Sequence, residues 1–218
     1  MENDIIAIVM AAGKGTRMKS KNSKLVQKIY GKEIVKRAVE NAEKAGVKDI
    51  VAVVGYKKEE VMKVLGDNIK YAFQDEMLGT GHAVMQAKEY LKGKKGKVLV
   101  LNGDVPLIRP ETLNKLIEKS IENKEYATLL TAIYDDPTGY GRIVRDEGGN
   151  IEGIVEEKDT TEEQKKITEI NAGIYCFDIE ALLEALEKIT PNNKQGEYYI
   201  TDVIQIMNNR GLKTGAVI

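Results

Sequence analysis

Uninterrupted apolar runs alternate with helix-like segments through the first half of the chain. The runs at 5–10, 50–54 and 98–101 are apolar at every position, which indicates strands buried on both faces. Because parallel strands need a long crossover connection, the alternation predicts βαβ units and a mostly parallel sheet. Further strands are predicted at 70–74 and 127–133, and helices at 34–45, 59–65, 81–91 and from Pro110 onward.

The second half of the chain has a different pattern. Short strand-like pieces at 142–145, 151–155 and 172–177 are separated by turns, and 148–150 (Gly-Gly-Asn) has the composition of a hairpin turn. Helices are predicted at 179–189 and 201–209, and a last strand at 213–218. We therefore expect a single α/β domain: a Rossmann-like, mostly parallel sheet flanked by helices, with an antiparallel addition packed on it.

Composition excludes several classes of protein. The 218 residues include 33 lysines and arginines against 34 acids, and this net charge of −1 argues against a nucleic-acid-binding surface over the whole protein. A single cysteine, Cys176, and a single histidine, His82, exclude a disulfide framework and Cys- or His-rich metal centres within one chain. No apolar run approaches the roughly 18–20 residues of a membrane span. The acidic start is unlike a secretory signal, so we expect a cytoplasmic protein.

A glycine-rich turn follows the first predicted strand. The turn at 13–15 (Gly-Lys-Gly) can offer backbone N–H groups to phosphate oxygens, and Arg17 and Lys24 add positive charge. It is not a Walker A loop, since no Gly-Lys pair is followed by Ser or Thr, and it lacks the third glycine of a dinucleotide-binding motif. Taken alone, an ordinary strand-exit turn with solvated cations is an equally good interpretation.

Two other predicted strand ends carry polar side chains. Asp104 could hold Mg²⁺ together with water and phosphate oxygens, or it could simply cap the turn before Pro106. Gln74 offers both a donor and an acceptor, which suits the edge of a nucleobase. The glycines on either side of Thr80 allow close backbone approach, and Thr80 could cap the following helix. For His82 a packed or capping role is the favoured interpretation.

Four polar islands lie between apolar strands in the second half. They are 139–143, 156–159, 169–173 and 195–202. Each could be a solvated loop. Four such islands facing a phosphate-type turn suggest a polar second substrate such as a sugar.

In this order, these segments resemble the bacterial N-acetylglucosamine-1-phosphate uridyltransferases, the N-terminal half of the bifunctional GlmU proteins. The resemblance covers essentially the whole chain. Its most specific stretches are 78–84 (Leu-Gly-Thr-Gly-His-Ala-Val) and 196–202 (Gly-Glu-Tyr-Tyr-Ile-Thr-Asp), whereas 10–18 (Met-Ala-Ala-Gly-Lys-Gly-Thr-Arg-Met) is shared by sugar nucleotidyltransferases generally. The other matching segments are 103–107, 135–143, 153–156, 158–159 and 169–171.

The resemblance implies a GT-A-like nucleotide-diphospho-sugar transferase fold and a set of site residues. The implied nucleotide-binding residues are Met10, Ala11, Ala12, Gly13, Lys24, Gln74, Gly79, Thr80, Asn102, Gly103 and Asp104. The residues implied to hold the amino-sugar phosphate are Gly141, Glu156, Asn171, Tyr199 and Thr201. Arg17, Lys24 and Asp104 are implied to be catalytic, with Asp104 as a ligand of the cofactor Mg²⁺. On this basis we expect 1–125 to bind the nucleotide and 126–218 to bind the sugar.

The chain also departs from the family's pattern. Ser23, Met77 and Ala172 stand where the family often has proline, glutamine and threonine. The family's second metal ligand is an asparagine well beyond the position of Asp202, so we expect this chain, which stops at Ile218, to lack it. The β-helix domain that carries acetyltransferase activity in the bifunctional proteins is expected to be missing too. The parent protein is expected to be a homotrimer organised by that domain, and this piece a monomer.

The implied activity is that of a UDP-N-acetylglucosamine diphosphorylase. An oxygen of N-acetylglucosamine 1-phosphate attacks the α-phosphorus of UTP and releases pyrophosphate. No general base is required, because the second pKa of a phosphate is about 6 and the attacking group is already largely ionised. The alternatives are a nucleotidyltransferase that uses another nucleotide or sugar phosphate, and a non-catalytic nucleotide-sugar sensor. Neither a nucleic acid nor a membrane is expected as a partner.

Overall fold

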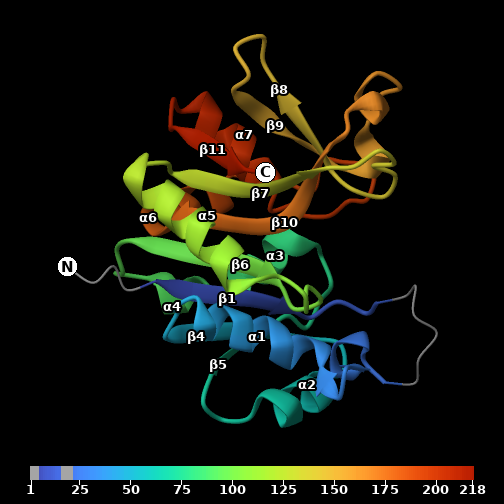
Figure 1. The fold of residues 1–218 in the computed structure, drawn as a ribbon, viewed down its shortest axis with the longest axis vertical. Coiled ribbons are helices and arrows are strands. Elements are labelled where there is room, and N and C mark those ends of the chain that lie inside the picture. Colours follow the sequence, from blue (N-terminus) through green and yellow to red (C-terminus); the bar gives the residue numbers. More distant parts are fainter. Residues whose placement is uncertain (1–4, 16–21) are drawn as a thin grey trace.

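The computed structural model describes residues 5–15 and 22–218, and nine of their strands form one sheet (Figure 1). These strands are β1 Ile6–Ala11, β4 Asp49–Val54, β5 Lys70–Phe73, β6 Lys97–Asn102, β7 Ala127–Ile133, β8 Arg142–Arg145, β9 Ile151–Val155, β10 Glu169–Asp178 and β11 Thr214–Val217. The main order is β11-β7-β10-β6-β1-β4-β5, and β8 and β9 extend the sheet from β10. The pairs β6–β1, β1–β4 and β4–β5 are parallel, as predicted.

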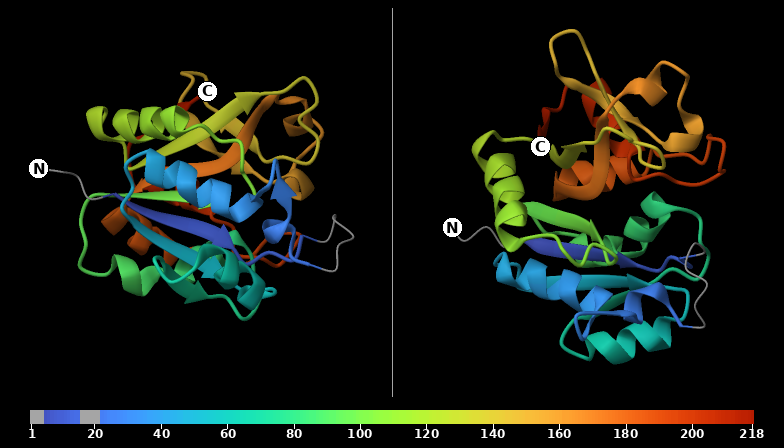
Figure 2. Two further views of the ribbon diagram at one scale, coloured as in Figure 1. Left: turned by 60° about the horizontal axis from the view of Figure 1, so that its bottom comes forward. Right: turned by 45° about the vertical axis from the view of Figure 1, so that its right-hand side comes forward.

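Helices cover both faces of the sheet (Figures 1 and 2). They are α1 Ile34–Lys44, α2 Lys58–Leu65, α3 Thr80–Gln86, α4 Lys88–Leu91, α5 Pro110–Glu122, α6 Ile179–Leu186 and α7 Asp202–Asn209. In β1, Ile6 and Ile8 belong to the core formed with α3, α4, α6 and α7, whereas Ala7 and Val9 belong to the core formed with α1 and α5. Both faces of β1 are buried, which explains why its sequence does not alternate.

β10 joins the two halves of the chain in one sheet. It lies between β6 and β7 and is antiparallel to both, while β11 pairs in parallel with β7. β8 and β9 form the predicted hairpin around the turn at 148–150. The predicted fold class is confirmed, but the antiparallel addition continues the sheet instead of packing against it.

Three local details differ from the prediction. The helix predicted at 81–91 is interrupted at Ala87, whose N–H donates to the oxygen of Val84 (3.0 Å) in a tighter turn. The strand predicted at 172–177 begins earlier, at Glu169, and has a bulge after Asn171. The 3₁₀ turn η1 Lys24–Val26 and the hairpin of β2 Lys28–Ile29 and β3 Lys32–Glu33 were not predicted, because elements this short show no hydrophobic period.

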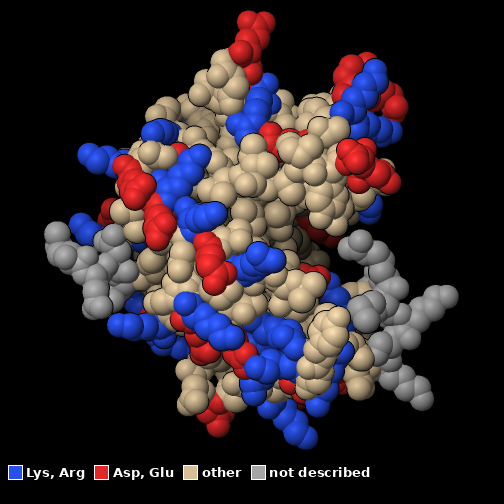
Figure 3. All heavy atoms as spheres, in the orientation of Figure 1, with Lys and Arg blue, Asp and Glu red and all other residues tan. Residues whose placement is uncertain are grey.

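The surface carries charges of both signs. Figure 3 shows lysine and arginine intermingled with aspartate and glutamate over the face in view, as the near-neutral composition suggests. Within the described residues, no helix has the length and apolar character needed to cross a membrane.

Candidate active site

Two pockets adjoin at the carboxyl edge of the parallel strands. The first has a volume of about 210 Å³, and the second, beside β10 and the loop at 138–141, a volume of about 700 Å³. They share Met10, Thr80, Asn102 and Asp104 in their walls. Ligands of doubly wound sheets bind at this edge, so molecules in the two pockets would lie next to each other.

The first pocket gathers most of the residues predicted to bind a nucleotide. Its walls include Met10, Ala12, Gly13, Lys24, Gln74, Gly79, Thr80, Asn102 and Asp104. Ala11 is buried within β1, and the Gly103 N–H donates to the oxygen of Met10 (2.9 Å), but neither residue lines the pocket. Arg17 lies outside the described residues.

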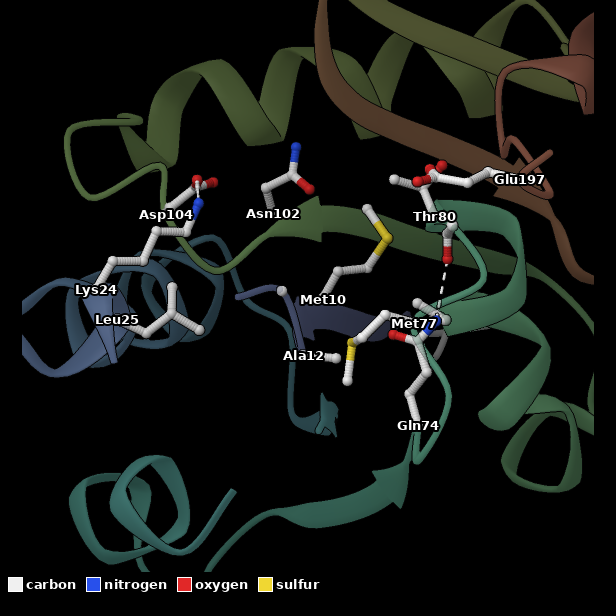
Figure 4. A pocket seen from close by; sticks show the side chains of 13 residues that line it. Met10, Ala12, Lys24, Leu25, Gln74, Met77, Thr80, Asn102, Asp104 and Glu197 are labelled. Atoms are coloured by element: carbon white, nitrogen blue, oxygen red, sulfur yellow. Dashed lines mark hydrogen bonds and ion pairs between the residues drawn. The ribbon is translucent and has the colours of Figure 1, made fainter. Parts of the chain in front are cut away.

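Lys24 and Asp104 meet at one end of the first pocket. Lys24 Nζ donates to Asp104 Oδ2 in an ion pair that joins η1 to the turn after β6 (Figure 4). Ser23 caps η1, since its Oγ accepts from the backbone N–H of Leu25 (3.3 Å). The Ser23 N–H donates to Glu60 Oε2 (2.8 Å), a bond that proline could not make. These two hydrogen bonds therefore fix the backbone at Ser23, next to Lys24, without a proline at this position.

Asp104 is the carboxylate best placed for a divalent cation. Its side chain is 39% exposed at the junction of the two pockets. Over the described part of the chain, no group of three or more Asp, Glu, His or Cys side chains is arranged to hold a metal. Mg²⁺ is commonly held by one or two carboxylates together with water and phosphate oxygens. The donor set therefore fits a cation that is bound jointly with a phosphate ligand.

The amide of Gln74 forms the inner wall of the first pocket. The residue is 3% exposed, and Nε2 donates to the oxygen of Gly79 (3.1 Å). Figure 4 shows the amide oxygen on the pocket side, close to Met77, with Met10 and Ala12 nearby. A flat ring held among these apolar side chains would meet a hydrogen-bond acceptor at its edge.

Thr80 ties α3 to the segment before α7. Its Oγ1 accepts from the backbone N–H of Ile200 (3.0 Å), and the Gly81 N–H donates to the oxygen of Tyr198 (2.7 Å). Thr80 does not cap α3 as expected, because the N-cap is Gly79 at φ 108°. A Cβ on Gly79 would lie 2.6 Å from the oxygen of Tyr198, so only glycine permits this close packing.

Glu156, Asn171 and Gly141 converge in the second pocket. A Cβ on Gly141 would lie 3.4 Å from Glu156 Oε2 and 3.5 Å from the Cβ of Asn171, so glycine keeps the space between them open. Thr201 does not line the pocket but donates from Oγ1 to Glu156 Oε1 (3.0 Å). Ala172, one of the departures from the family pattern, also lines the wall.

Tyr199 is, like Thr201, a predicted sugar residue that lies outside the lining of the second pocket. Its hydroxyl donates to Asp159 Oδ2 (3.3 Å) and accepts from Gln195 Nε2 (2.6 Å). Burial, followed by the nearby Asp159 carboxylate, raises the pKa of Tyr199 to about 12 although the Gln195 bond opposes the shift. Tyr199 does not line the second pocket, so any effect on a ligand there would be indirect.

Tyr175 is a site residue that the sequence did not predict. It is buried under the second pocket, and its hydroxyl accepts from Asn171 Nδ2 (2.7 Å). Asn171 Oδ1 accepts from the Gly173 N–H (3.0 Å), so the carboxamide is held from both ends. Nothing in the apolar run 174–177 distinguishes Tyr175 from an ordinary core residue, because only the position of β10 beside the pocket gives it a role.

Four carboxyl groups, one of which lines the second pocket, lie close enough to influence one another. They are Glu156, Asp159, Glu197 and Asp202. Burial raises the pKa of Glu156, and the other three carboxylates raise it further, while the bond from Thr201 lowers it. Burial and then Asp159 raise the pKa of Asp202 to about 6. Hydroxyl and amide N–H groups of a ligand would satisfy such carboxyl oxygens better than an anion would.

Replacing Asp202 with asparagine should stabilise the fold at neutral pH but not near pH 4. A carboxyl whose folded pKa is about 6, above its ordinary 3.8, binds a proton more tightly in the folded state. The folded state therefore loses stability as the pH rises from about 4 to about 6. Asparagine does not titrate, so the Asp202→Asn variant avoids this loss.

Solvent screening of the half-buried Asp202 should limit the gain to roughly 1 kcal/mol. Urea unfolding near pH 4 and near pH 7.5 measures it. Asp75→Asn, at a carboxylate that is 80% exposed, is the control and should leave stability unchanged at either pH. Equal stability of the Asp202→Asn variant and the parent at the higher pH would contradict the prediction.

Comparison with known proteins extends these observations. Residues 6–218 match a family model described as nucleotidyl transferase. The chain is 53% identical over 215 residues to the bifunctional protein GlmU of Caldanaerobacter subterraneus subsp. tengcongensis. The match covers 99% of this chain and 47% of that protein. The chain is 52% identical over 210 residues to the bifunctional protein GlmU of Clostridioides difficile, covering 96% and 46%. The chain spans about half the length of these curated relatives.

A solved structure shares the fold. It is a crystal structure from Bacillus anthracis, assigned as a glucose-1-phosphate thymidylyltransferase and determined in complex with sucrose. The TM-score is 0.81 over 98% of this chain and 87% of that chain, at 22% sequence identity.

Proposed function

The chain belongs to the nucleotidyl transferase family, and from this premise we propose that it transfers the uridylyl group of UTP to N-acetylglucosamine 1-phosphate. The products are UDP-N-acetylglucosamine and pyrophosphate. One observation carries the proposal. A pocket walled by the Gln74 amide adjoins a pocket walled by a carboxylate and a carboxamide, and the two share Asp104, which is paired with Lys24. This arrangement suits two phosphate-bearing substrates that must react with each other.

The first pocket is proposed to bind UTP. The oxygen of Gln74 can accept from N3–H of uracil, and Met10 and Met77 offer apolar contact to the ring. The triphosphate would then extend toward the turn at 13–15 and Lys24. In this proposal the part of the chain up to residue 125 binds the nucleotide.

The second pocket is proposed to bind the amino sugar. Sugar hydroxyls and the acetamido N–H are donors that the Glu156 carboxyl can accept from, and the Asn171 carboxamide can exchange one further bond. The 1-phosphate would lie toward Asp104, where the two pockets join. In this proposal residues 126–218 form the sugar-binding part.

The reaction would be an in-line displacement. An oxygen of the sugar phosphate forms a bond to the α-phosphorus of UTP, and the bond from that phosphorus to the bridging β-phosphate oxygen breaks. No side chain has to remove a proton, because a phosphate with a second pKa of about 6 is already ionised near neutral pH. Lys24 would exchange Asp104 for the phosphates and cancel part of the charge of the transition state. Asp104 would hold Mg²⁺, which when bound supplies further charge neutralisation.

Pyrophosphate release tests the proposal. The chain is assayed with Mg²⁺, N-acetylglucosamine 1-phosphate and each of UTP, CTP, ATP and dTTP, and then with UTP and glucose 1-phosphate. We expect release with UTP and the N-acetylated sugar above every other pair. A clear preference for another nucleotide or sugar would reassign the substrate. Binding of UDP-N-acetylglucosamine without any turnover would favour a sensor.

Replacing Tyr175 with phenylalanine should weaken the sugar side alone. The change removes the oxygen that accepts from Asn171 Nδ2, so the carboxamide loses one of its two fixed ends. We expect KM for the sugar phosphate to rise roughly tenfold, while KM for UTP stays the same. Tyr71→Phe is the control. It removes a tyrosine hydroxyl that donates to the oxygen of Gly66, at a half-buried position that lines neither pocket. An equal change in both KM values would argue against a role at Asn171.

A further inference from the structure

We propose that His82 is a positioning residue that makes Gln74 a pure hydrogen-bond acceptor toward the nucleobase, and so sets the preference for uracil over cytosine. The inference rests on the proposed function, since it assigns how that site recognises its base. His82 lies in the first turn of α3, where it contacts Gln74 but does not line the first pocket.

The amide nitrogen of Gln74 faces two groups that can accept its N–H hydrogens. Nε2 lies 3.1 Å from the oxygen of Gly79 and 3.1 Å from Nδ1 of His82. A carbonyl oxygen can only accept, so the contact with Gly79 fixes which end of the carboxamide is the nitrogen. With both hydrogens committed, the side chain can offer only its oxygen to a ligand.

His82 fills this role when Nδ1 has a free lone pair and the ring proton is on Nε2. The amide nitrogen of Gln86 lies 3.1 Å from Nε2, and an imidazole with one N–H cannot accept from both glutamines. Gln86 Nε2 also donates to the oxygen of His82 (3.1 Å), but Gln86 is only half-buried, so water can replace either contact when its amide turns over. Gln74 is 3% exposed and has no such replacement. Leaving a buried N–H unpaired costs more, so Gln74 decides the tautomer.

The orientation of this amide distinguishes two pyrimidines. Uracil has an N3–H group, which can donate a hydrogen bond to the oxygen of Gln74. Cytosine has a lone pair on N3 instead, which that oxygen repels. If the carboxamide of Gln74 rotated by half a turn, its nitrogen would meet the base and the preference would reverse. Gly79 opposes this rotation with one hydrogen bond, and His82 adds the second.

Two substitutions of His82 separate orientation from packing. His82→Leu keeps a side chain of similar size but has no acceptor. His82→Asn places an amide oxygen at about the position of Nδ1, since both atoms are bonded to Cγ, and so restores the acceptor. Equilibrium binding of UTP and of CTP in the presence of Mg²⁺ is measured by calorimetry for the parent and both variants, with thermal unfolding to verify folding.

The ratio of UTP affinity to CTP affinity should fall roughly tenfold in His82→Leu and recover in His82→Asn. An unchanged ratio in His82→Leu would overturn the inference, and so would an equal fall in both variants. The readout needs no turnover. If the parent prefers UTP but releases no pyrophosphate, the proposed reaction is wrong. The ratios of UTP to CTP affinity in the two variants would still show whether His82 orients Gln74. A parent without preference for UTP overturns both.

Discussion

Replacing Asp104 with asparagine should lower kcat for pyrophosphate release by about a thousandfold and leave the fold intact. The carboxylate stands where the two pockets join, paired with Lys24, and it is the group proposed to hold a cation among the phosphates. Asparagine keeps the shape but loses the charge that attracts Mg²⁺. The pair is partly exposed, so its loss should change stability by less than about 1 kcal/mol. Lys24→Ala should reduce turnover to a similar degree.

Asp49 provides a matched control for Asp104. It is also a partly exposed aspartate bound by lysine: Lys70 Nζ donates to its Oδ1 (2.6 Å) and Lys94 Nζ to its Oδ2 (2.7 Å). It stands at the first residue of β4, the opposite end of the parallel strands from both pockets. Steady-state kinetics of Asp49→Asn should match the parent. Near-normal turnover in Asp104→Asn would refute the assignment of the site.

Gly173→Ala should reduce kcat/KM by about a hundredfold, because it disturbs both pockets at once. Gly173 sits in the bulge of β10 at φ 71°, and its oxygen accepts from Asn102 Nδ2 (3.3 Å). A Cβ at this position would overlap the amide nitrogen of Asn102. The same residue donates its N–H to Asn171, so a displaced backbone moves one wall of each pocket.

Gly211→Ala is the control that distinguishes backbone strain from overlap with Asn102. The φ of 69° at Gly211 is nearly that of Gly173, but no atom lies within 4 Å of a Cβ built there. Both alanine variants should lose roughly 1 kcal/mol of stability from the left-handed backbone, as measured by urea unfolding. Only Gly173→Ala should lose activity. A fully active Gly173→Ala variant would show that the two pockets tolerate movement at the bulge.

The sequence predicted most of the strands of this fold for a simple physical reason. A strand buried on both faces must be apolar throughout, and runs such as 50–54 and 98–101 are long enough to be recognised. The chain order of strands does not reveal which strands become neighbours. The placement of β10 between β6 and β7 depends on tertiary pairing, and no local pattern predicted it.

The same limit applies to the candidate site. Lys24, Gln74 and Asp104 were predicted because they follow strand ends or match motifs, and the structure brings them into one pocket. The contacts behind them were not predicted. Tyr175 and His82 are indistinguishable in sequence from packed residues, because their roles depend on the neighbour that each one contacts.

β10 also limits how the molecule can move. Five residue pairs, from Ile174 opposite Leu101 to Asp178 opposite Lys97, join it to β6, and its other edge is bonded to β7. Swinging the two proposed substrate-binding parts away from each other would break this ladder, so the sheet resists hinge motion. Any adjustment to a ligand would fall to segments outside the sheet, such as 138–141, which lines the second pocket. The stiffness of a single strand therefore sets the spacing between the two proposed phosphate positions before either substrate arrives.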